Sequence, residues 1–225
     1  MKKLSLVTSM LFLLVFCVAA QEHSSGPTAA EALANLQQGN ERYTQGTLQP
    51  KDYAQERAAL AKTQHPYAII LTCADSRVSP EILFDESLGK LFVIRVAGNV
   101  TEPAVLGSIE YAAEHLHSPL LVVLGHEGCG AVAAALAGGT NPKNLSTLIK
   151  YIVPAADSAK RKGLGDKQTF DAAVRENVHL QIKRARSQST VVNEFVKKKE
   201  LQIVGAVYHL ESGQVEWIDR PSEKQ

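Results

Sequence analysis

Two short clusters of metal-binding side chains are the most informative part of this sequence of 225 residues. Cys73, Asp75 and Arg77 follow one apolar run, and His126 and Cys129 follow another. Two thiols, an imidazole and a carboxylate form a tetrahedral ligand set of the kind that zinc favours. A zinc site that keeps one position for water or for an exchangeable carboxylate is catalytic rather than structural. The clusters therefore predict a metal-dependent enzyme.

The spacing within each cluster allows its side chains to meet one ion. Cys73 and Asp75 are two residues apart just past an expected strand, so in extended geometry both side chains point the same way. His126 and Cys129 lie in a loop whose glycines let the backbone curl; these are Gly125, Gly128 and Gly130. In open parallel sheets, ligands bind beyond the carboxyl ends of the strands, where both clusters are expected.

Arg77 adds a mechanism to this site. A guanidinium group can hold a carboxylate bidentately, so Arg77 can draw Asp75 away from the metal and leave a position for water. Zinc then lowers the pKa of that water toward neutrality and generates hydroxide. The predicted reaction is attack of zinc hydroxide on a small electrophile.

The N-terminus has the layout of a secretory signal peptide. Lys2 and Lys3 precede an apolar run over 11–18 that closes on small residues up to Ala20. The run is shorter than the roughly 20 apolar residues that a membrane span needs. We expect a signal peptide over 1–20, cleavage after Ala20 and export to the periplasm or medium, with no stable span in the mature chain.

A lipid anchor at Cys17 is the second interpretation of this segment. Phe16 is bulky where lipoprotein signals carry a small residue, so cleavage is preferred over acylation. Cleavage removes two lysines and no acidic residue, which leaves 24 − 2 = 22 basic against 23 acidic residues. This balance gives no electrostatic footprint for nucleic acid.

Export allows a competing interpretation of the cysteines. Without Cys17, Cys73 and Cys129 are an even pair, and such pairs often form disulfides in oxidising compartments. A disulfide explains neither Asp75 and Arg77 nor His126, whereas a metal site uses all of them. A zinc-binding or disulfide-linked protein without turnover remains the alternative to an enzyme.

Strand and helix patterns alternate along the rest of the chain. Short runs rich in Ile, Val and Leu predict buried parallel strands, at 67–72, 91–96, 120–124 and 201–208. Residues 209–218 predict a hairpin that adds an antiparallel edge strand. Helices are expected between the strands, at 103–115, 131–137, 170–186 and 190–198, with a polar loop at 158–168. The predicted fold is α/β, a mainly parallel sheet flanked by helices, in one domain over 21–225 with an N-terminal helical arm at about 28–62.

These motifs resemble those of the β-class carbonic anhydrases. The similarity extends over nearly the whole mature chain, and the Cys-Ala-Asp-Ser-Arg motif combined with the His126 to Cys129 spacing is highly specific. Further similar segments are 92–99 (FVIRVAGN), 108–112 (SIEYA) and 176–178 (ENV). The resemblance implies an exported bacterial enzyme with that fold and one zinc ion per chain. It also implies reversible hydration of carbon dioxide to bicarbonate and assembly as a homodimer or homotetramer.

The resemblance also assigns residue roles. Cys73, His126 and Cys129 would bind zinc permanently, and Asp75 would be either the fourth ligand or the partner of Arg77. For the substrate, the resemblance implies contacts from Gln64 of a neighbouring subunit, from Tyr111 in the pocket wall, and from backbone at Gly98, Asn99 and Gly130.

One departure from part of the family concerns regulation. Members that bind bicarbonate at a non-catalytic site carry a tryptophan and an arginine where this sequence has Ile69 and Ile82. We therefore expect the open, plant-type active site near neutral pH. The motifs also leave open a sister hydrolase that acts on another linear electrophile such as carbon disulfide.

Overall fold

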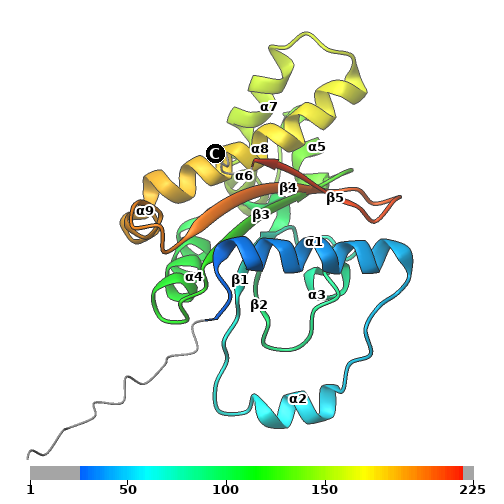
Figure 1. Cartoon of the computed structure of the whole chain (residues 1–225). Coiled ribbons are helices and arrows are strands. Elements are labelled where there is room, and N and C mark those ends of the chain that lie inside the picture. The colour runs from blue at the N-terminus through cyan, green and yellow to red at the C-terminus, as the bar shows by residue number, and fades with distance from the viewer. Residues whose placement is uncertain (1–25, 220–225) are drawn as a thin grey trace, which may run out of the picture.

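A five-stranded sheet with the order β2-β1-β3-β4-β5 organises residues 26–219, the part of the chain that the computed structural model describes (Figure 1). Its strands are β1 (Ala68–Thr72), β2 (Leu91–Arg95), β3 (Leu120–His126), β4 (Gln202–Tyr208) and β5 (Val215–Asp219). The first four are parallel and β5 pairs antiparallel with β4, which confirms the predicted fold class. The expected signal peptide and Cys17 lie outside the described residues.

Helices cover both faces of this sheet. On the chain before β3 they are α1 (Ala29–Gln45), α2 (Tyr53–Ala59), α3 (Pro80–Leu83) and α4 (Pro103–Glu114), with a 3₁₀ turn η1 (Ala97–Asn99). After β3 they are α5 (Gly130–Ala137), α6 (Lys143–Ile149), α7 (Val153–Lys160), α8 (Asp166–Gln188) and α9 (Thr190–Lys197). Within residues 26–219 no helix has both the length and the apolar character needed to cross a bilayer.

The polar loop expected at 158–168 is shorter than predicted. Helix α7 continues to Lys160 and α8 begins at Asp166, so only five residues connect them. The buried face of α7 consists of Ala155, Ala156 and Ala159, whose small side chains give a weak hydrophobic pattern in the sequence. An acidic residue in the first turn favours a helix start at Asp166.

The alternation of side chains along β1 determines which layer each residue meets. Ile69 and Leu71 point into the core shared with α4, α5, α7, α8 and α9, and Cys73 lies in this core too. Ala68 and Ile70 point into the opposite core, which includes Leu36 of α1. In Figure 1, α1 lies across one side of the sheet and α8 across the other. Cys73 therefore lies on the α8 side.

Asn40 fixes the helical arm to the body of the protein. Its side-chain amide donates hydrogen bonds to the carbonyls of Leu83 (3.0 Å) and Gly213 (2.9 Å), and its oxygen accepts one from the Val215 amide (2.9 Å). Because Asn40 is buried, each of these bonds compensates a polar group removed from water. They connect α1 to α3 and to the β4–β5 hairpin.

Asp85 anchors the chain that leaves α1. The residue has a positive φ of 49° and is buried. Its carboxylate accepts hydrogen bonds from Arg42 Nε, from Lys51 Nζ (2.9 Å) and from the Gln49 amide (3.2 Å). Burial opposes ionisation, but these donors outweigh it and hold the pKa of Asp85 below its ordinary value.

Replacement of Asp85 by Asn tests this anchor, because Asn also tolerates a positive φ. We expect the free energy of unfolding to fall by about 2 kcal/mol at neutral pH, since charge-assisted hydrogen bonds are lost. The folded pKa lies below the unfolded value of about 3.9, so the contribution is complete above that value and disappears as the pH falls through the folded pKa.

Urea unfolding at about pH 7 and about pH 3 measures this difference. The gap between wild type and Asp85→Asn should shrink at the lower pH. Asp157→Asn, at an exposed position, serves as the matched control and should change stability by no more than about 0.5 kcal/mol at either pH. An equal gap at both pH values would contradict the role of the charge.

Candidate metal centre

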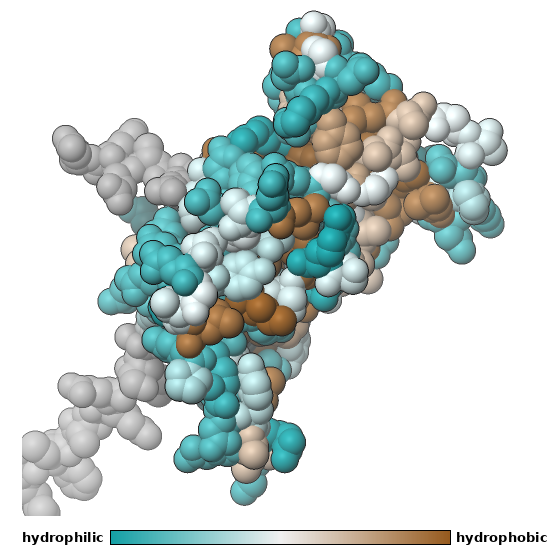
Figure 2. Space-filling model, turned by 90° about the vertical axis from the view of Figure 1, so that its right-hand side faces the viewer, coloured by the Kyte–Doolittle hydropathy of each residue, from teal (hydrophilic) through white to brown (hydrophobic). Residues whose placement is uncertain are grey.

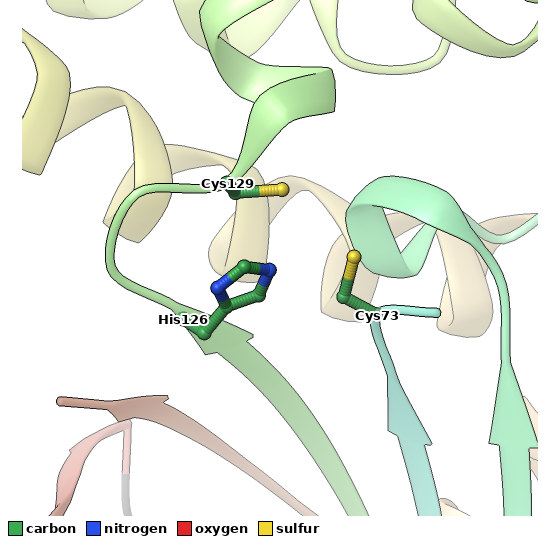
Figure 3. A group of neighbouring side chains, drawn as sticks. All are labelled: Cys73, His126 and Cys129. Carbon is green, nitrogen blue, oxygen red and sulfur yellow. The ribbon is translucent and has the colours of Figure 1, made fainter. Parts of the chain in front are cut away.

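Cys73, His126 and Cys129 converge at the carboxyl edge of the sheet. Cys73 follows β1, His126 ends β3, and Cys129 is the N-cap residue of α5. All three residues are buried, and their ligand atoms lie within 4.8 Å of one another. Figure 3 shows the two sulfur atoms and the imidazole ring pointing into one shared space. The two sequence clusters therefore form a single site.

His126 shows that this group fits a metal ion. Its Nδ1–H donates to the carbonyl of Glu127 at 2.7 Å, which leaves Nε2 as the free lone pair. Nε2 is buried and has no hydrogen-bond partner among the described residues. A buried polar atom without a partner is costly, and a cation shared with the two sulfurs would satisfy it. Cysteine sulfur and histidine nitrogen are ligands that zinc prefers.

Cys73 carries the thiolate of the pair. The neighbouring Cys129 thiol lowers the pKa of Cys73 far below its ordinary value, against the effect of burial. The Gly98 amide contributes to this shift by donating a hydrogen bond to Cys73 Sγ at 3.3 Å. The same coupling and burial raise the pKa of Cys129. A thiolate is the form of cysteine that binds metal.

Asp75 lies beside these ligands and is held by Arg77. Arg77 Nε and Nη2 donate to the two carboxylate oxygens at 2.9 and 2.8 Å, and the Arg77 amide donates at 3.0 Å. The nearer carboxylate oxygen is 3.9 Å from His126 Nε2. Of the two arrangements foreseen for Asp75, the structure therefore has the pair with Arg77. This pair holds the pKa of Asp75 well below its usual range.

Arg95 at the end of β2 shapes the backbone of the first cluster. Its Nε donates to the carbonyl of Cys73 (3.2 Å) and its Nη2 to the carbonyl of Asp75 (2.6 Å). These two bonds set the path of the loop that carries both side chains. Sequence reasoning gave Arg95 no role, because an arginine at a strand end has no distinctive spacing.

Gly98, in the 3₁₀ turn η1, is the residue whose backbone amide donates a hydrogen bond to Cys73 Sγ. Its φ is +70°, and an added Cβ would lie 2.4 Å from Ile152 Cδ1 and 3.0 Å from Ala131 Cβ. Glycine is therefore required by both the backbone conformation and the space. The resemblance placed Gly98 near the substrate; the structure shows its amide directed at the thiolate.

A buried polar network holds η1 against α8. Asn177 Nδ2 donates to the Gly98 carbonyl at 2.9 Å. Gln181 accepts from the Thr101 amide (2.9 Å) and donates to Asn177 Oδ1 (2.9 Å). Sequence reasoning missed the functional meaning of these residues. The sequence offered one signal of this network: the side-chain amides of Asn177 and Gln181 are four residues apart, on the face of α8 that also carries Val178.

Gln64 and Tyr111 are not brought to this cluster within one chain. Gln64 is exposed before the amino end of β1, whereas Cys73 follows the carboxyl end. Tyr111 is half exposed near the end of α4, where its ring packs against Phe92 at the start of β2 (centroids 6.2 Å apart).

The remaining residues named for the substrate adjoin residues of the site: Asn99 follows Gly98, whose amide contacts Cys73, and Gly130 follows Cys129. Asn99 is buried, and its Nδ2 has no hydrogen-bond partner among the described residues. Gly130 is exposed as the first residue of α5, directly after Cys129. Both are therefore carried by the backbone segments that carry the ligands or contact them.

Comparisons with known proteins identify the family of this chain. A family model described as carbonic anhydrase matches residues 68–215. Carbonic anhydrase 2 of Mycobacterium tuberculosis is 43% identical over 183 residues, covering 79% of this chain and 87% of that protein. The β-carbonic anhydrase of Coccomyxa, solved with acetazolamide, superposes with a TM-score of 0.69 at 26% identity and covers 88% of each chain.

A tetrameric β-carbonic anhydrase from Sordaria macrospora has the same fold, with a TM-score of 0.69 at 22% identity, covering 84% of this chain and 94% of that one. The family match spans most of the chain, and the mycobacterial relative is aligned over most of its length. This chain belongs to the β-class carbonic anhydrases, a family of lyases.

Replacement of Gly98 by Ala tests the amide directed at Cys73. We expect the free energy of unfolding to fall by about 2 kcal/mol, because alanine disfavours this φ and its Cβ collides with Ile152. Zinc affinity should fall as well, since the amide moves away from the thiolate. Urea unfolding of the metal-free protein and zinc competition with a chelator measure the two effects.

Gly107→Ala is the matched control, because Gly107 is exposed in α4 and nothing lies within 4 Å of its added Cβ. This variant should gain up to about 1 kcal/mol from helix propensity and keep its zinc affinity. If Gly98→Ala behaved like Gly107→Ala, the requirement for glycine at position 98 would be wrong.

Proposed function

We propose that this protein is a zinc-dependent carbonic anhydrase that catalyses the reversible hydration of carbon dioxide to bicarbonate and a proton. The observation that carries the proposal is the buried, unpartnered Nε2 of His126, which faces Cys73 and Cys129 beside a carboxylate held by Arg77. Membership of the β-class carbonic anhydrases supports this assignment.

Each residue of the site has a defined part in this reaction. Cys73, His126 and Cys129 would hold one zinc ion per chain. Zinc, when bound, supplies a Lewis acid that makes water a nucleophile near neutral pH. Asp75 is kept ionised by Arg77, and an ionised carboxylate can only accept hydrogen bonds. It therefore orients a proton-bearing nucleophile, while Arg77 keeps it out of the ligand set.

The placement of Gln64 and Tyr111 supports an oligomer. Both lie toward the amino ends of the parallel strands, whereas the cluster of their own chain lies at the carboxyl ends. They can therefore serve a substrate only at the site of a neighbouring subunit. We therefore propose a homodimer or homotetramer, in keeping with the closed symmetry common among soluble oligomers. The related Sordaria enzymes are tetrameric.

Exposed apolar side chains supply a surface for such an assembly. Leu48, Ile82 and Leu88 are each at least 40% exposed and line one hollow between the arm and α3. On the face shown in Figure 2, apolar groups interrupt a largely hydrophilic surface. Apolar patches of this kind commonly mark interaction sites.

Two further parts of the proposal concern location and regulation. The mature enzyme would act outside the cytoplasm. Its signal peptide would be cleaved near Ala20, an outcome that we favour over acylation of Cys17. Ile69 is fully buried and Ile82 is exposed, and neither side chain can donate a hydrogen bond to an anion. The protein would therefore lack the non-catalytic bicarbonate site that other family members carry.

Stopped-flow hydration of carbon dioxide, with zinc content measured on the same mature preparation, tests the function. We expect one zinc ion per chain and rapid hydration, and we expect Cys73→Ser to lose both, because a hydroxyl replaces a thiolate ligand. Zinc without hydration would point to another linear electrophile such as carbon disulfide. A metal-free protein with linked cysteines would overturn the proposal.

Replacement of Arg77 by Ala tests the carboxylate clamp. Asp75 would be free to enter the ligand set, so kcat should fall about 100-fold, whereas zinc content should be unchanged because no ligand is removed. Arg77→Lys should lie between wild type and Arg77→Ala, since lysine is a point charge that cannot hold both oxygens. Full activity in Arg77→Ala would refute the clamp.

A further inference from the structure

Glu127 connects the metal centre to a group of charged residues that the reaction does not use. Its backbone carbonyl accepts the hydrogen bond from His126 Nδ1 (2.7 Å), and its amide donates to the Tyr208 carbonyl (3.0 Å). The main chain of Glu127 therefore determines the ring orientation of His126. The next residue, Gly128, has a φ of +64°, so the chain turns immediately after this carbonyl.

The side chain of Glu127 is held at both oxygens. Oε1 lies 2.7 Å from His209 Nδ1, and Oε2 accepts a hydrogen bond from the Leu210 amide at 3.1 Å. Both partners come directly after β4, the strand that pairs with β3, and β3 ends at His126. The loop of the second cluster is thereby fastened to the end of β4 through a side chain as well as through the sheet.

His209 is itself fixed from the other side. Its Nε2 lies 3.1 Å from Glu216 on β5, and Glu216 accepts two hydrogen bonds from Arg175 on α8 (2.9 and 2.5 Å). Burial opposes protonation of His209, but the two carboxylates outweigh it and raise its pKa. A protonated imidazole donates from both nitrogens, which matches a carboxylate at each end.

We propose that Glu127 is a positioning residue for the metal ligand His126. His209 and the Leu210 amide hold the side chain of Glu127 in place. This fixes the Glu127 carbonyl, which accepts from His126 Nδ1 and so directs Nε2 at the ion. The inference rests on the proposed zinc site but not on its substrate. Groups that orient a metal-binding histidine commonly change metal affinity by 10-fold to about 100-fold when they are altered.

Glu127→Ala tests this role, because it removes the side-chain anchors and leaves the accepting carbonyl in place. In the mature zinc-loaded protein, we expect chelator-driven zinc release to accelerate about 10-fold. In cobalt-substituted protein, we expect the visible ligand-field bands to shift, because the His126 ring is held less firmly. A role in stability alone would not move these bands.

Two partial variants make the test independent of the folding of Glu127→Ala. Glu127→Gln keeps one acceptor oxygen, so it should restore much of the wild-type release rate. His209→Ala removes one of the two anchors, so its release rate should lie between those of wild type and Glu127→Ala. These rates can be compared even if Glu127→Ala does not fold.

Glu176→Ala is the matched control, because Glu176 is also partly exposed and has two partners, Lys162 (2.7 Å) and Ser158 (3.4 Å). It should leave zinc release and the cobalt spectrum unchanged. If Glu127→Ala and His209→Ala both matched Glu176→Ala, the positioning role would be wrong. A protein that retains zinc but does not hydrate carbon dioxide would refute the proposed function and leave this test intact.

Discussion

The arrangement of this protein depends on one buried nitrogen lone pair. His126 Nε2 has no hydrogen-bond partner in the described structure, and two sulfur atoms face the same space. Leaving such a group unsatisfied inside a protein is costly, and a cation shared with the two sulfur atoms would satisfy it. The carboxyl edge of the sheet, the glycine turns and the charged residues around the loops all act to bring these three ligand atoms together and to keep them oriented.

Much of the fold was predictable because most of its strands are apolar runs, and the central strands β1 and β3 are buried along their whole length. Near-continuous apolar runs identify β1 to β4, and the turn residues after β4 identify the antiparallel edge. Helices α3 and α6 were missed because each spans only one or two turns, and α7 because its buried face is alanine. Hydrophobic periodicity has too little length or contrast to reveal such helices.

The site, like the fold, was predictable where its signal is local in the sequence. The sequence contained the ligands and the Asp75–Arg77 pair, because these residues are close in sequence and their types are distinctive. It did not reveal the contacts of Arg95, Asn177 or His209, because these depend on which loops the sheet places side by side. An amide or a histidine within an otherwise ordinary helix or strand end has many structural roles, and only its partners identify the one in use.

Charge balance explains why Asp75 is paired rather than added to the ligands. With a divalent cation bound, Cys73 and Cys129 would both be thiolates that balance its charge, and a neutral His126 would add none, so Asp75 as a further ligand would make the buried centre negative. Burying an uncompensated charge is costly. Arg77 neutralises Asp75 one for one at the exposed side of the site, where its guanidinium remains in contact with water. Because Arg77 and Asp75 are only two residues apart, their pairing needs no movement of the sheet. The Asp75–Arg77 pair is therefore formed within the first cluster itself, beside the buried ligand atoms.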